Sequence, residues 1–86
     1  EPHERLACID REGRAEGLPL VYHDTGALLH TLARGCGARR ILEIGTCIGY
    51  STLWMATALP ADGALITMEY DAGRAGRARD HFAPGG

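Results

Sequence analysis

Two acidic residues and a short glycine-bearing stretch between them are the parts of this sequence that could do chemistry. Glu43 precedes a loop that runs from Gly45 to Gly49, and Glu69 follows twenty residues after the second glycine. Glycines in such a loop let the backbone approach a ligand closely, and backbone N–H groups there suit a nucleotide-like molecule. A carboxylate at the end of the next strand can accept hydrogen bonds from both hydroxyls of a ribose. Together these features predict a site for an adenosine-type ligand.

The spacing within this loop excludes several other sites of similar appearance. The dinucleotide fingerprint needs glycines where the sequence has Cys47 and Tyr50. The phosphate-binding P-loop needs a lysine, and this chain contains none, while the nucleophile elbow would need a glycine in place of Leu53. The carboxylate of Glu43 would repel a diphosphate and attract a cationic group. The charge pattern therefore favours S-adenosylmethionine, which carries an α-ammonium group and no phosphate, over NAD.

The elements that must position these residues follow from the spacing of apolar side chains and from the turn residues between them. The run over 41–44 is apolar apart from Glu43, which predicts a strand buried on both faces, as in a parallel sheet. A strand–helix–strand crossover of this length predicts a right-handed parallel unit and an α/β fold class. The expected helices cover 2–16, the stretch from Asp24 or Thr25 to glycines 35 and 37, 51–59 and 72–82; the expected strands cover 41–44 and 64–68, the latter ending at Glu69.

Composition limits the class of protein. The chain has 86 residues, a formal net charge of −2, and 45% hydrophobic residues. These values favour a soluble globular chain of at most one domain and argue against a polybasic contact with nucleic acid or membrane. Three cysteines without CxxC spacing argue against a disulfide framework or zinc ribbon and favour the reduced thiols of a cytoplasm. No apolar stretch approaches the ~18 residues of a transmembrane helix.

The stretch LEIGTCIGYST, from Leu42 to Thr52, resembles the first motif of S-adenosylmethionine-dependent O-methyltransferases of the catechol and caffeoyl-CoA O-methyltransferase type. Flanking features match as well, among them Thr25-Gly26, Asp62-Gly63 and the run from Ile66 to Glu69. The resemblance covers about residues 18–84. It implies the N-terminal part of a Rossmann-like class I methyltransferase fold, in a domain that is typically more than twice this length.

The resemblance also implies a set of cofactor contacts. Glu43 and the backbone of Gly45 would hold the methionine end of the cofactor, and Glu69 would bind the ribose. Tyr50 and Ser51 would approach the amino-acid carboxylate. The implied cofactor-binding residues are Val21, Glu43, Gly45, Cys47, Gly49, Tyr50, Ser51, Met68, Glu69 and Tyr70.

The resemblance places the metal ligands, the general base and most of the acceptor pocket downstream of Gly86. We therefore expect no catalytic and no metal-binding residue in this chain, which would be inactive and only marginally stable alone. Residues 1–86 would be one partial domain, with an N-terminal helix over 1–17 and a cofactor-binding portion over 18–86. By the same resemblance, the longer parent enzyme would use a divalent cation, Mg²⁺, and would methylate a hydroxyl of a small-molecule acceptor. It would have no nucleic-acid or membrane partner and could form a homodimer.

Other functions stay open. A non-catalytic nucleotide-binding or interaction module could keep the strand–helix–strand unit, and an NAD-type oxidoreductase fragment is disfavoured by the loop residues described above. Structural roles also compete with functional ones for individual residues. We expect Trp54 and Met55 to lie in the core or an interface, and the helix over 72–82 to present Arg74, Arg77, Arg79 and His81 to solvent.

Overall fold

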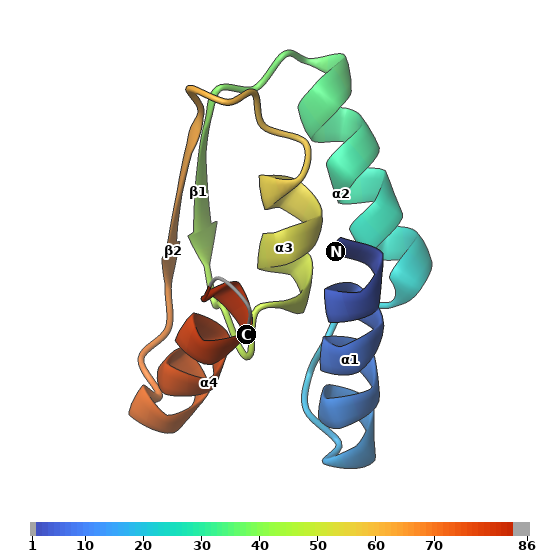
Figure 1. The fold of residues 1–86 in the computed structure, drawn as a ribbon, viewed down its shortest axis with the longest axis vertical. Coiled ribbons are helices and arrows are strands. Elements are labelled where there is room, and N and C mark those ends of the chain that lie inside the picture. The colour runs from blue at the N-terminus through green and yellow to red at the C-terminus, as the bar shows by residue number, and fades with distance from the viewer. Residues whose placement is uncertain (1, 84–86) are drawn as a thin grey trace.

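The computed structural model describes residues 2–83, in which the first three helices lie on one side of two parallel strands and the fourth lies at their end (Figure 1). The order of elements agrees with the order that the sequence predicts, which confirms an α/β fold. The elements are α1 (Pro2–Ala15), α2 (His23–Gly35), β1 (Arg40–Ile44), α3 (Tyr50–Ala56), β2 (Ala64–Met68) and α4 (Ala72–Phe82). Within this part of the chain, no helix is both long and apolar enough to span a bilayer.

The two strands run side by side in one direction, with Leu42 opposite Ile66 and Glu43 opposite Thr67. The helix α3 makes the crossover between them and packs between the sheet on one side and helices α1 and α2 on the other (Figure 1). Because both strands run in the same direction, their carboxyl ends meet at one edge, where the chain turns into the loop over 45–49 and into α4. This edge is where the sequence places the ligand site.

The helix α3 is shorter than the sequence predicts, because it ends at Ala56 rather than at Leu59. The next residues continue in tighter turns, with the N–H of Ala58 donating to the Met55 carbonyl and that of Leu59 to the Ala56 carbonyl. Pro60 follows and cannot donate a backbone hydrogen bond, so the helix cannot resume.

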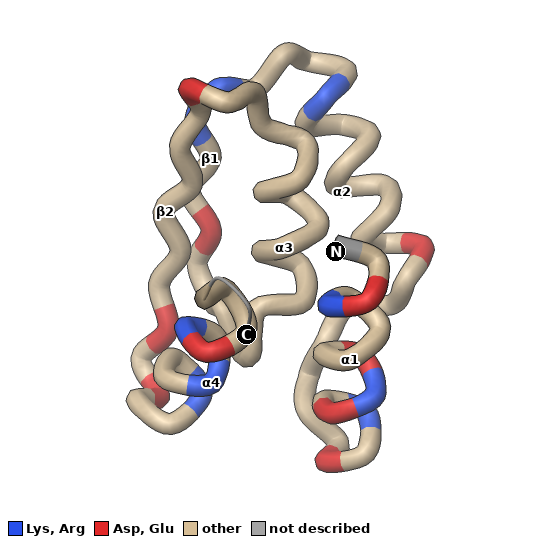
Figure 2. Tube along the Cα trace, in the orientation of Figure 1, with Lys and Arg blue, Asp and Glu red and all other residues tan. Residues whose placement is uncertain are grey.

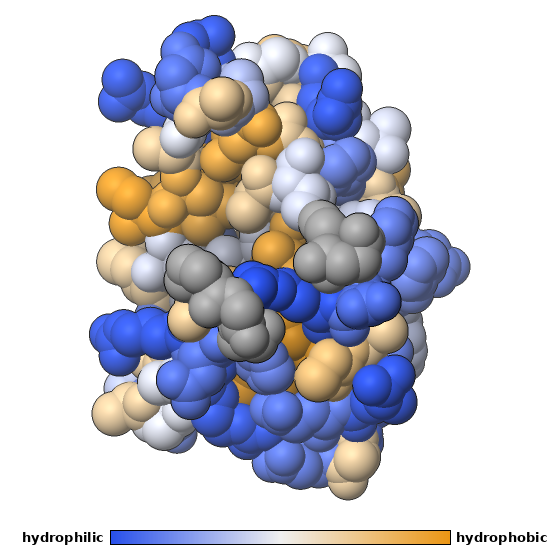
Figure 3. Space-filling view, in the orientation of Figure 1, coloured by the Kyte–Doolittle hydropathy of each residue, from blue (hydrophilic) through white to orange (hydrophobic). Residues whose placement is uncertain are grey.

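The prediction that the first strand is buried on both faces is wrong for the described residues. Leu42 is 63% exposed and Ile44 80% exposed, and their partners Ile66 and Met68 are 64% and 47% exposed. Side chains alternate between the two faces of a strand, so these four project from the same face, opposite to α3. Figure 3 shows the apolar surface that results over the strands. We call Leu42, Ile44, Ile66 and Met68 the bare sheet face.

The core lies on the other side of the sheet, where α1 packs against α3 and the loop before it. Leu6 is 6% exposed and Ile9 is fully buried, and both join Ile48 and Tyr50 in one apolar cluster. These two apolar side chains, one turn apart, dock α1 on the core. Partly buried side chains from the α1–α2 linker and from α3 complete the cluster: Leu18, Leu20, Val21, Leu53 and Trp54.

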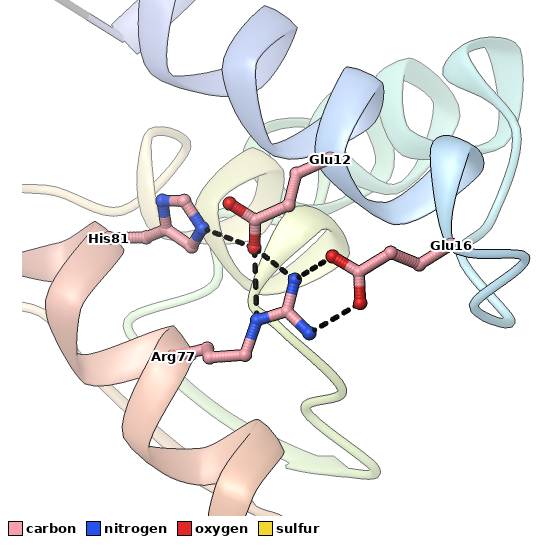
Figure 4. Close-up of polar contacts among 4 residues, drawn as sticks. All are labelled: Glu12, Glu16, Arg77 and His81. Carbon is pink, nitrogen blue, oxygen red and sulfur yellow. Dashed lines mark hydrogen bonds and ion pairs between the residues drawn. The ribbon is translucent and has the colours of Figure 1, made fainter.

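An ion cluster joins α1 to α4, the two helices that carry much of the charge (Figures 2 and 4). The Arg77 guanidinium donates to Glu12 at 2.5 Å and to Glu16 at 2.7 Å, and His81 Nε2 lies 3.3 Å from Glu12 Oε2. The hydrogen bond from Arg77 lowers the pKa of Glu12, and the carboxylates, Glu16 first, raise the pKa of Arg77. The expectation that Arg77 and His81 face solvent alone is wrong, because the carboxylates of α1 reach across to both.

Candidate functional site

A cleft of about 610 Å³ opens at the carboxyl ends of β1 and β2. The end of each strand contributes to it, as do the first turn of α4 and the linker between α1 and α2. The residues that line the cleft are Pro19, Ile44, Gly45, Cys47, Met68, Glu69, Tyr70 and Arg74. Its position agrees with the rule that ligands of parallel α/β sheets bind beyond the carboxyl ends of the strands.

The loop over 45–49 turns sharply to form one wall of this cleft. Gly45 has a φ of 97° and Gly49 a φ of 102°, both in the region that favours glycine. Cys47 also has a positive φ, 53°. Among the described residues it is the one non-glycine residue with a positive φ. The N–H groups of Gly45 and Thr46 both donate to the carbonyl of Met68, at 2.8 and 3.1 Å. The start of the loop is thus fixed to the end of β2.

Gly49 lies directly beneath the last turn of α4. A Cβ atom at this position would be 2.6 Å from Cζ of Phe82 and 2.7 Å from its Cε1, which is closer than real Cβ atoms approach a neighbour. At Gly45 the equivalent Cβ would meet no atom within 4 Å. Both glycines therefore allow the positive φ of the loop, but only Gly49 also makes room for the aromatic ring of Phe82.

Glu69 is held in place by two backbone N–H groups. Its Oε1 accepts from Cys47 N at 2.7 Å and its Oε2 accepts from Asp71 N at 3.2 Å. A carboxylate has about four lone-pair positions, so roughly two on Glu69 stay available to a ligand. A fixed carboxylate with two vacant acceptor positions is suited to a pair of neighbouring hydroxyl groups.

Glu43 is surrounded by hydroxyl groups on the side of the sheet that faces α3. Ser51 donates to its Oε2 at 2.5 Å, Thr67 donates to its Oε1 at 2.8 Å, and Thr52 also donates to Oε1. Thr67 in turn lies 2.5 Å from the hydroxyl oxygen of Thr46 in the loop. This hydroxyl network was not predicted, although Thr67 stands opposite Glu43 in the strand register.

The structure brings half of the implied cofactor-binding residues to the cleft. These are Gly45, Cys47, Met68, Glu69 and Tyr70. The other five are not among the cleft residues: Val21 in the linker, Glu43 in β1, Gly49 at the end of the loop, and Tyr50 and Ser51 at the start of α3. Tyr50 is 2% exposed and belongs to the core, and Ser51 turns its hydroxyl toward Glu43.

Three residues of the cleft were not predicted. Pro19 comes from the irregular linker, and Ile44 and Arg74 were assigned to a buried strand and to a solvated helix surface. The helix α4 begins at Ala72, as the sequence predicts, and Asp71 caps it by accepting a hydrogen bond from Arg74 N at 2.9 Å. Arg74 therefore stands in the first turn of α4, close to the end of β2, where it lines the cleft.

No metal centre is present among residues 2–83, because no three His, Cys, Asp or Glu side chains gather closely enough to hold an ion. The three cysteines are all unpaired, with Cys47 buried and Cys8 and Cys36 exposed. What the cleft offers chemically is binding: two acceptor positions on Glu69, an apolar rim from Ile44 and Met68, and an aromatic side chain in Tyr70.

Known proteins resemble this chain over most of its length. A family model described as O-methyltransferase matches residues 13–84. The catechol O-methyltransferase of Niastella koreensis is 54% identical over 57 residues, which are 64% of this chain and 26% of that protein.

Solved structures agree with the sequence comparison. The O-methyltransferase TomG from Streptomyces achromogenes, determined in complex with SAM, is 46% identical, with a TM-score of 0.83. The O-methyltransferase from Bacillus cereus, determined in complex with SAH, is 38% identical, with a TM-score of 0.82. Each match covers 91% of this chain and 36% of the solved chain. The chain thus spans between about a quarter and about a third of the length of these relatives.

Proposed function

This chain belongs to the O-methyltransferase family, and from that premise we propose that it is the S-adenosylmethionine-binding portion of an enzyme that methylates a hydroxyl of a small-molecule acceptor. The family membership confirms the resemblance that the motif over 42–52 indicates. The activity is proposed for the whole protein, because this chain covers only part of the length of its relatives.

The observation that carries the proposal is the position and bonding of Glu69. Its carboxylate lies in the cleft with one acceptor position filled on each oxygen, by Cys47 N and Asp71 N. The two remaining positions match the two neighbouring hydroxyls of a ribose. The solved relatives in complex with SAM and SAH support this assignment, because both ligands contain one ribose.

The cleft also suits the rest of this cofactor. Ile44 and Met68 give it an apolar rim and Tyr70 an aromatic surface, both of which favour an adenine ring. The carboxylate of Glu43 is joined through Thr67 to Thr46 of the same loop, and its negative charge disfavours a diphosphate there. We therefore assign Gly45, Cys47, Met68, Glu69 and Tyr70 as the residues that contact the cofactor. Val21, Glu43, Gly49, Tyr50 and Ser51 stay predictions from the resemblance.

When bound, the cofactor would supply an electrophilic methyl group on its sulfur. This chain's own contribution is to hold that group: Glu69 fixes the ribose, and the loop over 45–49 closes one side of the cleft. The divalent cation that the resemblance implies does not fit residues 2–83, which gather no ligand set for it. A site for Mg²⁺, the general base and the acceptor pocket are proposed for residues outside this chain.

We propose two further properties of the whole protein. A cytoplasmic location fits the three unpaired cysteines. A homodimer fits the apolar side chains of Leu28 and Leu32, which are 55% and 58% exposed on α2. Light scattering on the purified complete gene product measures the oligomeric state directly.

The experiment that tests the proposed function is a calorimetric titration of S-adenosylhomocysteine into the complete gene product. We expect binding of one ligand per chain and no comparable binding of NAD. Glu69→Gln keeps the size of the side chain but replaces one acceptor oxygen with a donor, and we expect it to weaken binding by at least about tenfold. Glu4→Gln, on the exposed side of α1, is the matched control and should bind as the wild type does. Equal affinity of Glu69→Gln and wild type would contradict the proposal.

A further inference from the structure

One wall of the cleft is attached to α1 and not to the sheet. Pro19, from the linker between α1 and α2, lines the cleft together with the ends of both strands and the first turn of α4. The linker folds back along α1, where Leu18 N donates to the Gly13 carbonyl at 2.9 Å (Figure 1). A Cβ atom on Gly13 would lie 2.3 Å from Cδ1 of Leu20, so the linker packs closely on the helix. The position of Pro19 therefore depends on α1.

The side chain of Arg14 joins α1 to the end of this linker. Its Nη2 donates to the Val21 carbonyl at 2.7 Å, and its Nε donates at 2.5 Å to Asp10, one turn earlier on α1. The guanidinium carbon also lies 5.3 Å from the centre of the Tyr22 ring and 5.9 Å from that of Tyr50, within the range of cation–π contacts. Tyr50 is buried and begins α3 directly after the glycine loop. Arg14 thus connects α1, the linker and the start of α3.

The linker has few backbone hydrogen bonds of its own beside the cleft. Pro19 has no N–H, and among residues 19–22, all of them described, only Leu20 donates to another backbone group, the Leu18 carbonyl at 2.8 Å. A hydrogen bond from an ionised donor is roughly twice as strong as one between neutral groups. The bond from Arg14 to the Val21 carbonyl is therefore a strong restraint on a segment that its own backbone holds weakly.

We propose that Arg14 is a positioning residue for the cofactor site, which acts by fixing the linker that carries Pro19. The inference rests on the proposed function for the identity of the ligand, whereas the contacts of Arg14 do not depend on it. Arg14 does not line the cleft itself. It holds the Val21 carbonyl, two residues after Pro19, and so sets the wall that Pro19 contributes. Losing this bond lets that wall move away from the ligand.

Calorimetric titration of S-adenosylhomocysteine into the complete gene product tests this role. Arg14→Met keeps the length of the side chain but removes its donors, and we expect it to weaken binding about tenfold, as the loss of a hydrogen bond from a charged group would. Arg11→Met is the matched control, because Arg11 is exposed on the same helix and makes no polar contact within residues 2–83. Equal affinity of Arg14→Met and wild type would overturn the inference. Failure of the wild type to bind would instead overturn the proposed function.

A conservative variant separates positioning from a general loss of stability. Arg14→Lys keeps a cation that can donate to the Val21 carbonyl, so we expect its affinity to return to within about threefold of the wild type. Affinity as low in Arg14→Lys as in Arg14→Met would overturn the role of this hydrogen bond. Calorimetric stoichiometry distinguishes weaker binding from a loss of folded protein in each variant.

Amide exchange followed by NMR tests the same wall without ligand. The amides of Leu18 and Leu20, on either side of Pro19, report opening of the linker. We expect both to exchange at least about fivefold faster in Arg14→Met than in the wild type. The amide of Gly63, which closes a turn before β2, should be unchanged. Unchanged exchange at Leu18 and Leu20 would overturn the inference whatever the ligand.

The coupling between the linker and the ligand must also act in the opposite direction. A wall that improves binding is itself held by the bound ligand, because coupling between two equilibria is reciprocal. We therefore expect saturating S-adenosylhomocysteine to slow exchange at Leu20 in the wild type, and to slow that of Gly63 much less. Equal exchange at Leu20 with and without bound ligand would show that the linker is not coupled to the site, and would overturn the inference.

Discussion

Replacing Gly49 with alanine tests how closely α4 packs on the loop over 45–49. Gly49 has a φ of 102° and a ψ of 13°, a left-handed conformation that costs a residue with a side chain about 1–2 kcal/mol. The added Cβ would also lie 2.6 and 2.7 Å from two ring atoms of Phe82, so the ring must move. Overpacking of this kind costs about 1–3 kcal/mol. We therefore expect Gly49→Ala to lower the free energy of unfolding by about 2–5 kcal/mol.

Gly45→Ala is the matched control within the same loop. Gly45 has a φ of 97°, similar to that of Gly49, but its added Cβ would meet no atom within 4 Å. We expect this variant to lose only the conformational part, about 1–2 kcal/mol. The difference between the two variants measures the contact between the loop and the Phe82 ring.

The assay is urea denaturation of the complete gene product, with the midpoint and the slope fitted for each variant. A third variant combines Gly49→Ala with Phe82→Leu, which removes the ring atoms that the new Cβ would meet. We expect a coupling of about 1 kcal/mol between the two substitutions, because contacting residues are not additive. Equal losses in Gly49→Ala and Gly45→Ala, with no coupling to Phe82, would show that the ring does not lie over the loop and would refute the reasoning.

Other predictions concern contacts between helices. Arg77→Met should lower stability by about 1 kcal/mol at pH 7 in thermal denaturation, since its ion pairs are partly exposed. Because Arg77 lowers the pKa of Glu12, the stability that Arg77 contributes is present above the ordinary pKa of a glutamate and is lost as the pH falls through the lowered pKa of Glu12. A difference in stability between wild type and Arg77→Met that is the same at pH 3 as at pH 7 would contradict this. Gly26→Ala should cost about 1–3 kcal/mol and shift the fluorescence of Trp54, because the new Cβ would lie 2.3 Å from the indole Cδ1. Gly35→Ala, on the same helix with nothing within 4 Å, should be neutral or stabilising.

The order of elements was predictable because each one leaves a local pattern in the sequence. Gly35 and Gly37 mark the end of α2, and the apolar runs around Glu43 and Ile66 mark the two strands. The position of Glu69 at the cleft was predictable for a geometric reason, since parallel strands bring their carboxyl ends to the same edge. The five site residues that reach the cleft all lie next to one of these two strand ends.

The rest depends on contacts between segments that no local pattern encodes. The burial of Tyr50 in the core was missed, because its neighbours in space include Leu6 and Ile9 of α1, more than forty residues away in the sequence. The partners of Glu43 come from the register of β2 and the rotation of α3, neither of which can be read from spacing. The bare sheet face was missed because an apolar run indicates burial without indicating what covers it.

The ion cluster between α1 and α4 also has a consequence for the order in which the chain assembles. It joins residues that lie 65 and 61 positions apart, whereas Glu43 and Thr67 of the paired strands are 24 apart. The entropy of closing a loop grows with its length, so contacts across the crossover form at lower cost than the contact between the two terminal helices. Strand pairing around α3 should therefore precede the meeting of α1 with α4 during folding.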